Sequence, residues 1–174
     1  IAGKVDIVVN NAEVHRTQGV ASRRGTDVAR AEMDINYLGA LRLALKYPDK
    51  FCGAMVLSPA VYDPVPPATS ASRLTSQFAR NGKFDEALWK SLNYPALLPA
   101  YAQGKARVAL WIASGDHDHL GIAAQSANLY WKMFQIQPKQ VELRIVDGDH
   151  EWLAFRETFP DALRYVESKC VGGK

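Results

Sequence analysis

The chain has 174 residues, of which 48% are hydrophobic and 22% are charged. This composition excludes extended disorder and fits one globular domain. A formal net charge of +3 is too small to indicate nucleic-acid binding. No apolar run reaches the roughly 20 residues of a membrane span, and no charged segment leads into an apolar run as in a signal peptide. We therefore expect a cytoplasmic protein without a nucleic-acid or membrane partner.

Cysteine occurs twice, at Cys52 and Cys170. Two cysteines are too few for a disulfide-built scaffold or a four-cysteine zinc site. Cys52 lies in a strongly apolar segment, so we expect it to be a buried core residue. Cys170 is expected to be a free thiol in a fraying tail.

Strand and helix patterns alternate along the chain. Short apolar or β-branched runs bounded by turn residues predict strands at residues 5–9, 51–57, 107–113 and 141–146. Longer segments with helical spacing of apolar residues predict helices over 28–46, 120–136 and 151–169. Pro160 is expected to bend the last helix. Residues 12–25 read as a polar loop, and residues 62–104 as a lobe of short helices.

Strands that alternate with helices in this order predict a parallel sheet with right-handed crossovers. The sequence therefore predicts a three-layer α/β fold, in which flanking helices cover a small, mostly parallel sheet of about four strands. If consecutive strands are neighbours, the crossover helices share one face and the final helix covers the other. We expect a single domain over residues 1–174 that leaves apolar surface uncovered and so forms a homodimer.

Two predicted strand ends are followed by dense polar segments. Residues 116–119 (DHDH) follow the third strand, and residues 147–152 (DGDHEW) follow the fourth. Ligands gather at the carboxyl ends of parallel strands, where these segments would place an acid beside a histidine. Such an acid orients the imidazole, which then acts as a general base. The alternative is that these residues only cap helices and shape turns.

The polar segments belong to longer stretches with a recognisable pattern: residues 39–51 (GALRLALKYPDKF), 57–61 (LSPAV), 114–118 (SGDHD) and 148–152 (GDHEW). With them, residues 39 to about 169 closely resemble a bacterial esterase group of the α/β-hydrolase superfamily. The resemblance implies that Asp118 is the triad acid, with Asp116 as second choice, and that His150 is the triad base. It also implies a small ester substrate and no cofactor.

The nucleophile of that family is missing from its expected place. A Gly-x-Ser-Met-Gly-Gly elbow precedes the Gly-Ala-Leu-Arg stretch in the family, which puts the serine at Asp34. Its flanking glycines would fall at Glu32, Asn36 and Tyr37. An elbow needs glycines because its serine sits in a strained turn between closely passing chains. Residues 33–37 (MDINY) fit a continuing helix instead, and the sequence contains no Gly-x-Ser-x-Gly motif.

The first 38 residues resemble a different family. Residues 4–12 (KVDIVVNNA) are similar to the fourth strand and Asn-Asn-Ala-Gly motif of short-chain dehydrogenases. Residues 33–39 (MDINYLG) resemble the helix that follows, with its family asparagine at Asn36. Glu13 replaces the motif glycine, and no Tyr-x-x-x-Lys follows at the expected place. The glycine-rich cofactor turn would precede residue 1, so no cofactor is expected. The sequence thus resembles a chimera of residues 1–38 from a dehydrogenase and residues 39–174 from an esterase.

We therefore expect an esterase-like domain that folds but hydrolyses esters poorly or not at all. A first alternative is a working esterase in which Ser58, or a water held by His150, replaces the missing serine. A second alternative is a metal-binding domain, since histidine and aspartate cluster in the polar segments. Convergence of His117 and His119 on His150 would favour the metal-binding alternative. The candidate metal ligands are Asp116, His117, Asp118, His119, Asp147, Asp149 and His150.

Overall fold

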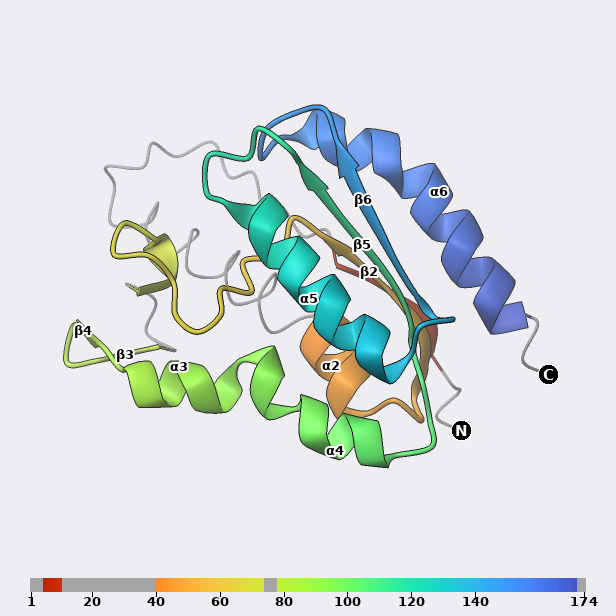
Figure 1. Cartoon of the computed structure of the whole chain (residues 1–174), viewed down its shortest axis with the longest axis horizontal. Helices are drawn as coiled ribbons and strands as arrows, with labels where there is room; N and C mark the ends of the chain where they lie inside the picture. The colour runs from red at the N-terminus through yellow and green to blue at the C-terminus, as the bar shows by residue number, and fades with distance from the viewer. Residues whose placement is uncertain (1–4, 11–39, 74–77, 172–174) are drawn as a thin grey trace.

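The structure, a computed structural model, describes residues 5–10, 40–73 and 78–171. Its centre is a sheet of four parallel strands in the spatial order β1-β2-β5-β6 (Figure 1). These strands are β1 (Val5–Asn10), β2 (Phe51–Leu57), β5 (Ala109–Gly115) and β6 (Val141–Val146). The predicted α/β fold with a small parallel sheet is confirmed, and β5 begins and ends slightly later than expected.

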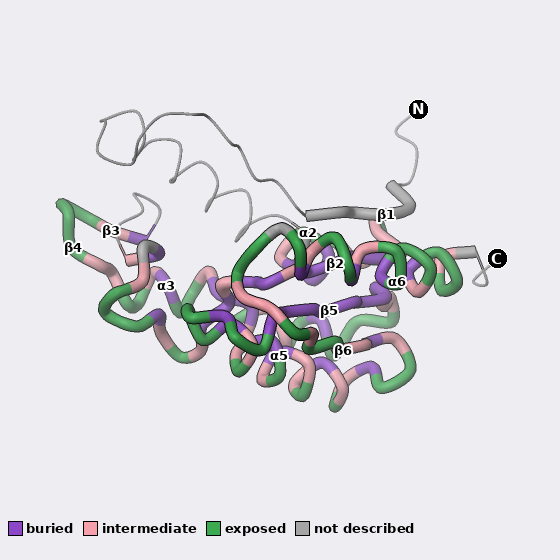
Figure 2. Tube along the Cα trace, turned by 90° about the horizontal axis from the view of Figure 1, so that it is seen from above, coloured by how far each residue is buried: buried purple, intermediate pink, exposed green. Residues whose placement is uncertain are grey.

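The central strand β5 builds both cores of the molecule. All of its residues are buried (Figure 2), and successive side chains point to opposite faces of the sheet. Leu110 and Ile112 belong to the larger hydrophobic cluster, whereas Trp111 and Ala113 belong to the smaller one on the other face. A continuous apolar run is therefore what this strand requires.

Helices cover both faces of the sheet. α2 (Ala40–Lys46) and α5 (Ile122–Ile136) pack on the larger cluster, and α6 (Trp152–Val171) packs on the smaller one (Figure 1). This is the expected division, in which the final helix alone covers its face. The buried residues of α6 recur every fourth position, which aligns them on one side of the helix. They are Ala154, Thr158, Ala162 and Val166.

The long helix α6 runs on through Pro160, where the sequence predicts a bend. Proline lacks a backbone N–H and therefore removes one helical hydrogen bond, but packing of the buried stripe on the sheet holds the helix on both sides of it. Among the described residues, no helix has both the length and the apolar character needed to cross a membrane.

The segment between β2 and β5 consists of short elements. A small hairpin of β3 (Ala79–Arg80) and β4 (Lys83–Phe84) precedes α3 (Glu86–Leu92) and α4 (Leu98–Gln103). Trp89 of α3 anchors the segment, because it is fully buried and its indole nitrogen donates to the Tyr62 carbonyl at 3.3 Å. Single turns of 3-10 helix at 71–73 and 94–96 complete it.

The domain boundaries proposed from the sequence stay predictions. The expected polar loop at 12–25 and the expected start of the first helix at residue 28 lie outside the described residues. The same holds for residues 32–37, where the missing elbow would fall. The first strand, by contrast, is described and pairs in parallel with β2.

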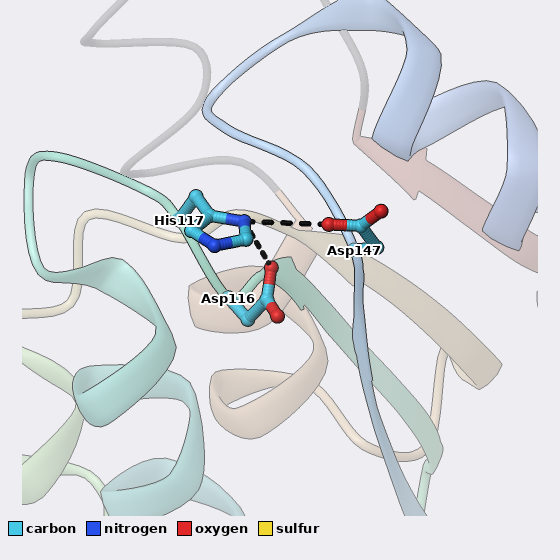
Figure 3. Close-up of side chains that lie close together, drawn as sticks. All are labelled: Asp116, His117 and Asp147. Atoms are coloured by element: carbon cyan, nitrogen blue, oxygen red, sulfur yellow. Dashed lines mark ion pairs between the residues drawn. The ribbon is translucent and has the colours of Figure 1, made fainter.

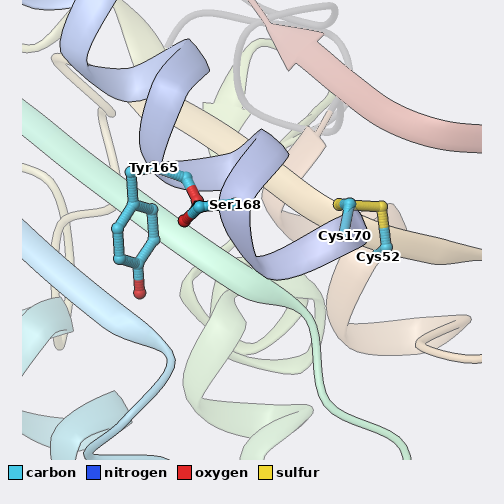
Figure 4. Close-up of a disulfide and its surroundings, with 4 residues drawn as sticks. All are labelled: Cys52, Tyr165, Ser168 and Cys170. Atoms are coloured by element: carbon cyan, nitrogen blue, oxygen red, sulfur yellow. Dashed lines mark hydrogen bonds between the residues drawn. A yellow bond between two sulfur atoms is a disulfide. The ribbon is translucent and has the colours of Figure 1, made fainter. Parts of the chain in front are cut away.

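Cys52 and Cys170 form a disulfide, with their Cα atoms 5.3 Å apart (Figure 4). The expectation of a separate core thiol and a tail thiol is therefore wrong. The physical reason is the four-residue stripe of α6, which extends from Val166 to Cys170 and faces β2. A Cβ added to Gly53 of β2 would lie only 2.2 Å from Cγ1 of Val166, so strand and helix pass very close to one another here.

Replacing Cys170 with serine should destabilise the fold, because the disulfide joins residues 118 positions apart and so restricts the unfolded chain. The chain-entropy estimate for a loop of this size is about 4 to 5 kcal/mol. Denaturant unfolding of the wild type and Cys170→Ser measures the difference. The Cys52→Ser/Cys170→Ser double variant should match the single variant, and an unchanged unfolding midpoint would contradict the prediction.

Candidate active site

Two loops meet at the carboxyl edge of the sheet, one after β5 and one after β6. The pairing of these strands extends to Gly115 and Val146, their last residues. Beyond that point the backbone bonds continue: the Asp116 N–H donates to the Val146 carbonyl, and the His117 N–H donates to the Gly148 carbonyl, both at 2.9 Å. The two polar segments of the sequence are thus joined along their backbones.

Two glycines set how closely these loops approach. A Cβ added to Gly115 would lie 2.2 Å from the carbonyl oxygen of Gly148, so any side chain at this position would push the loops apart. Gly148 itself has a φ of 145°, a conformation that favours glycine. Both residues are therefore needed for the loops to meet where they do.

The structure brings Asp118 and His150 together across this junction. Nδ1 of His150 lies 2.9 Å from Oδ2 of Asp118, whose side chain is fully buried, while the His150 side chain stays 34% exposed. The other Asp118 oxygen accepts a hydrogen bond from the Leu120 N–H at 2.9 Å. A buried carboxylate that holds one ring nitrogen leaves Nε2 of the partly exposed ring to face a reactant. Asp118, the first choice from the sequence, is thus the acid beside His150; the catalytic role of the pair stays a prediction.

Asp149 ties the two loops together at their exposed side. Its carboxylate accepts hydrogen bonds from the His150 N–H at 2.6 Å and the His119 N–H at 3.1 Å, and it lies 2.8 Å from Nδ1 of His119. These bonds, led by that of the His150 N–H, lower the pKa of Asp149 to about 2. The carboxylate in turn raises the pKa of His119. The sequence offered Asp149 only as a metal ligand, although its position next to His150 is a signal for this linking role.

Asp116, the second choice for the acid, contacts a different histidine. Its Oδ1 lies 2.9 Å from Nδ1 of His117 and accepts a hydrogen bond from the Gly148 N–H at 3.1 Å. Asp147 approaches the same ring nitrogen at 3.3 Å, as Figure 3 shows. These three side chains are solvent-exposed, and exposed ion pairs contribute little to stability.

Convergence of His117 and His119 on His150 would have favoured the metal-site alternative. They instead lie in two separate groups, Asp116–His117–Asp147 and Asp118–His119–Asp149. The His117 ring contacts the carboxylates of Asp116 and Asp147, and the His119 ring contacts that of Asp149. Both oxygens of Asp118 are engaged by His150 and Leu120. The ligand atoms of each group lie within 4.8 Å of one another, which is close enough to hold a metal ion.

The acid follows β5 and the histidine follows β6, which is the chain order of these residues in α/β-hydrolases. A comparison of sequences identifies the family. The sequence model of the family described as "Putative esterase" matches residues 38–166, about three quarters of the chain. The chain belongs to the putative esterase family. The matched span contains both polar loops, so Asp118 and His150 lie within the esterase part. No match was found among the curated proteins.

Solved esterase structures share the fold. A ferulic acid esterase is 19% identical with a TM-score of 0.50, and the likeness covers 76% of this chain and 48% of that chain. An S-formylglutathione hydrolase from Agrobacterium tumefaciens gives the same identity and TM-score, over 76% of this chain and 45% of that chain. This chain thus spans about half the length of these esterases. At such low identity the likeness shows the fold alone.

Replacing Asp149 with asparagine should lower the pKa of His119, because a neutral amide no longer favours the imidazolium. In the wild type, the pairing of His119 with Asp149 stabilises the fold fully below about pH 6.5, the ordinary histidine pKa. This contribution is lost as the pH rises through the raised pKa of His119 in the folded protein. On the acid side, the contribution of Asp149 is lost as pH falls toward 2. NMR titration of the His119 ring in wild type and Asp149→Asn measures the shift.

A matched control is Asp161→Asn, which removes an exposed carboxylate that pairs with Arg164 on α6. It should leave the His119 titration unchanged. Equal His119 pKa values in the wild type and Asp149→Asn would contradict the pairing.

Proposed function

We propose that this chain is an esterase-like domain that retains the acid and the base of the hydrolase machinery but does not hydrolyse esters efficiently. The observation that carries the proposal is the contact between the buried Asp118 carboxylate and Nδ1 of His150 at 2.9 Å. Its second support is the sequence itself, which contains no Gly-x-Ser-x-Gly motif. The substrate class that fits this parentage is a small ester.

The nucleophile and the general base contribute separately to the rate of ester hydrolysis. A general base contributes typically about 10²- to 10⁴-fold to a rate. Without an activated serine, His150 could only assist the attack of a water molecule, and the acyl-enzyme route that divides the reaction into two easier steps is closed. A poised acid–base pair without its nucleophile therefore gives slow hydrolysis at most.

Ser58 is the specific alternative to the missing nucleophile. It follows β2 directly, at the carboxyl edge of the sheet, and its φ of 40° is uncommon for a residue other than glycine. Its hydroxyl is buried and makes no hydrogen bond to any described residue. Nucleophilic serines of hydrolases sit on strained turns at strand ends, so these features favour Ser58 over other serines. No described hydrogen bond joins Ser58 to His150. The alternative with Ser58 as nucleophile therefore ranks below the main proposal.

Hydrolysis of p-nitrophenyl acetate by the wild type, His150→Ala and the control His117→Ala tests the main proposal. His117 is an exposed histidine of the neighbouring loop. Its replacement also removes one imidazole, but it leaves Asp118 and His150 in place. We expect equal, unsaturable rates for all three folded proteins. Saturable turnover that only His150→Ala abolishes would overturn the proposal.

The same assay separates the Ser58 alternative. Ser126 of α5 is a second buried serine whose hydroxyl has no described partner, so Ser126→Ala is the matched control for Ser58→Ala. If Ser58 is a nucleophile, a fluorophosphonate probe labels the wild type and Ser126→Ala but neither Ser58→Ala nor His150→Ala. Under the main proposal it labels none of them.

The chimeric origin of the chain remains a proposal supported by residues alone. The family match begins at residue 38, next to the boundary expected from the sequence, but it gives no support to a dehydrogenase origin for the preceding segment. The cytoplasmic location is a prediction from the sequence. The Cys52–Cys170 disulfide weighs against it, because such bonds persist mainly in oxidising compartments.

We also propose that the protein is a homodimer, since large apolar side chains remain exposed on its helices. Trp131 of α5 is 61% exposed and its ring stacks on that of Phe134, 6.0 Å between centroids, and burial of large aromatic side chains favours association. Light scattering on a size-exclusion column should give twice the mass of 19.2 kDa calculated for the chain. A monomer mass across the accessible concentration range would contradict it.

A further inference from the structure

An open cavity of about 520 Å³ lies on the surface at the end of the sheet opposite Asp118 and His150. Its described lining comes from three places: Arg107 before β5, the turn between α5 and β6, and the last turns of α6. A volume of this size falls within the range of small-molecule sites. The cavity shares no residue with the candidate active site. The lining residues are Arg107, Ile136, Gln137, Pro138, Lys139, Gln140, Ser168 and Lys169.

The charged side chains that line this cavity are all positive. Arg107, Lys139 and Lys169 contribute positive groups, and no acidic residue is part of its described lining. None of these three side chains forms an ion pair with a described residue, whereas Lys132, Lys90 and others elsewhere do. The Lys169 ammonium lies 5.6 Å from the centroid of the Tyr165 ring. A bound anion would supply a counter-charge to these cations.

Arg107 is held in place by backbone carbonyls. Its Nη1 donates to the carbonyls of Tyr101, Gly104 and Ala106, and its Nη2 donates to that of Ala102. The Tyr101 ring lies against the guanidinium, 5.2 Å from centroid to Cζ. No described residue accepts a hydrogen bond from its Nε, and Nη2 donates to one carbonyl only, so Nε–H and one Nη2–H remain for a ligand. A fixed guanidinium loses little side-chain freedom when it binds an oxyanion through two parallel bonds.

From these observations we propose that the cavity binds the phosphate group of a small molecule. Three cations match a dianion better than a singly charged carboxylate, and the guanidinium edge fits two oxygens of one phosphate. The cavity is larger than a bare phosphate needs, and Ile136 and Pro138 supply apolar surface beside the cations. This site is independent of the esterase chemistry and stands whether or not the chain hydrolyses esters.

Isothermal titration calorimetry at low salt, with inorganic phosphate and with glycerol 3-phosphate as probes, tests the proposal. We expect saturable binding that weakens with added salt, and that weakens roughly tenfold in Lys139→Gln and in Lys169→Gln, as the loss of a charged hydrogen-bond donor does. The tighter of the two probes tells whether the site takes the free ion or a monoester. Acetate should bind much more weakly than either.

The charge-matched control is Lys83→Gln, an exposed lysine on the β3–β4 hairpin, which should bind as the wild type does. Arg107→Lys keeps the charge but removes the fork, so it should also weaken binding; its thermal melt shows whether α4 still folds. Absence of saturable binding, an equal loss in Lys83→Gln, or acetate binding as tightly as phosphate would each overturn the proposal.

Discussion

The backbone of Gly115 passes so close to the Gly148 carbonyl that no side chain fits between them. This contact depends on β5 and β6 being adjacent parallel strands that end together. The hydrogen bonds that join the loops beyond the strands need the loops at this separation, because a hydrogen bond tolerates only a few tenths of an ångström. The acid and the base therefore meet because two glycines allow the backbones to meet first.

Asp118 and Asp116 differ in burial, and the buried one contacts His150. Asp116 and Asp118 both follow β5, two positions apart, and both belong to the polar segment of the sequence. The Asp118 carboxylate is fully buried against His150, whereas the Asp116 carboxylate is 47% exposed and contacts His117. A buried carboxylate is costly unless it is hydrogen-bonded, and His150 together with the Leu120 N–H supplies those bonds. Asp118 thus needs His150 for its own burial as well as for any chemistry.

The sequence predicts the sheet well because each central strand is a continuous apolar run with two buried faces, as in β5. It predicts the meeting of Asp118 and His150 because residues after adjacent parallel strands share one edge. It does not predict the disulfide, because Cys52 and Cys170 are 118 residues apart and only the packing of α6 on β2 brings them together. The linking role of Asp149 is equally hidden, since it depends on where the His119 backbone passes.

The contact between Asp118 and His150 is fixed by β5, β6 and the elements next to them. β5, β6 and their loops hold Asp118 and His150 through backbone bonds, and α6, which follows His150, is anchored by its buried stripe and by the disulfide to β2. The described hydrogen bonds that orient the pair all come from within residues 116–150. Asp118 and His150 are therefore held in contact by two adjacent strands and the loops that follow them.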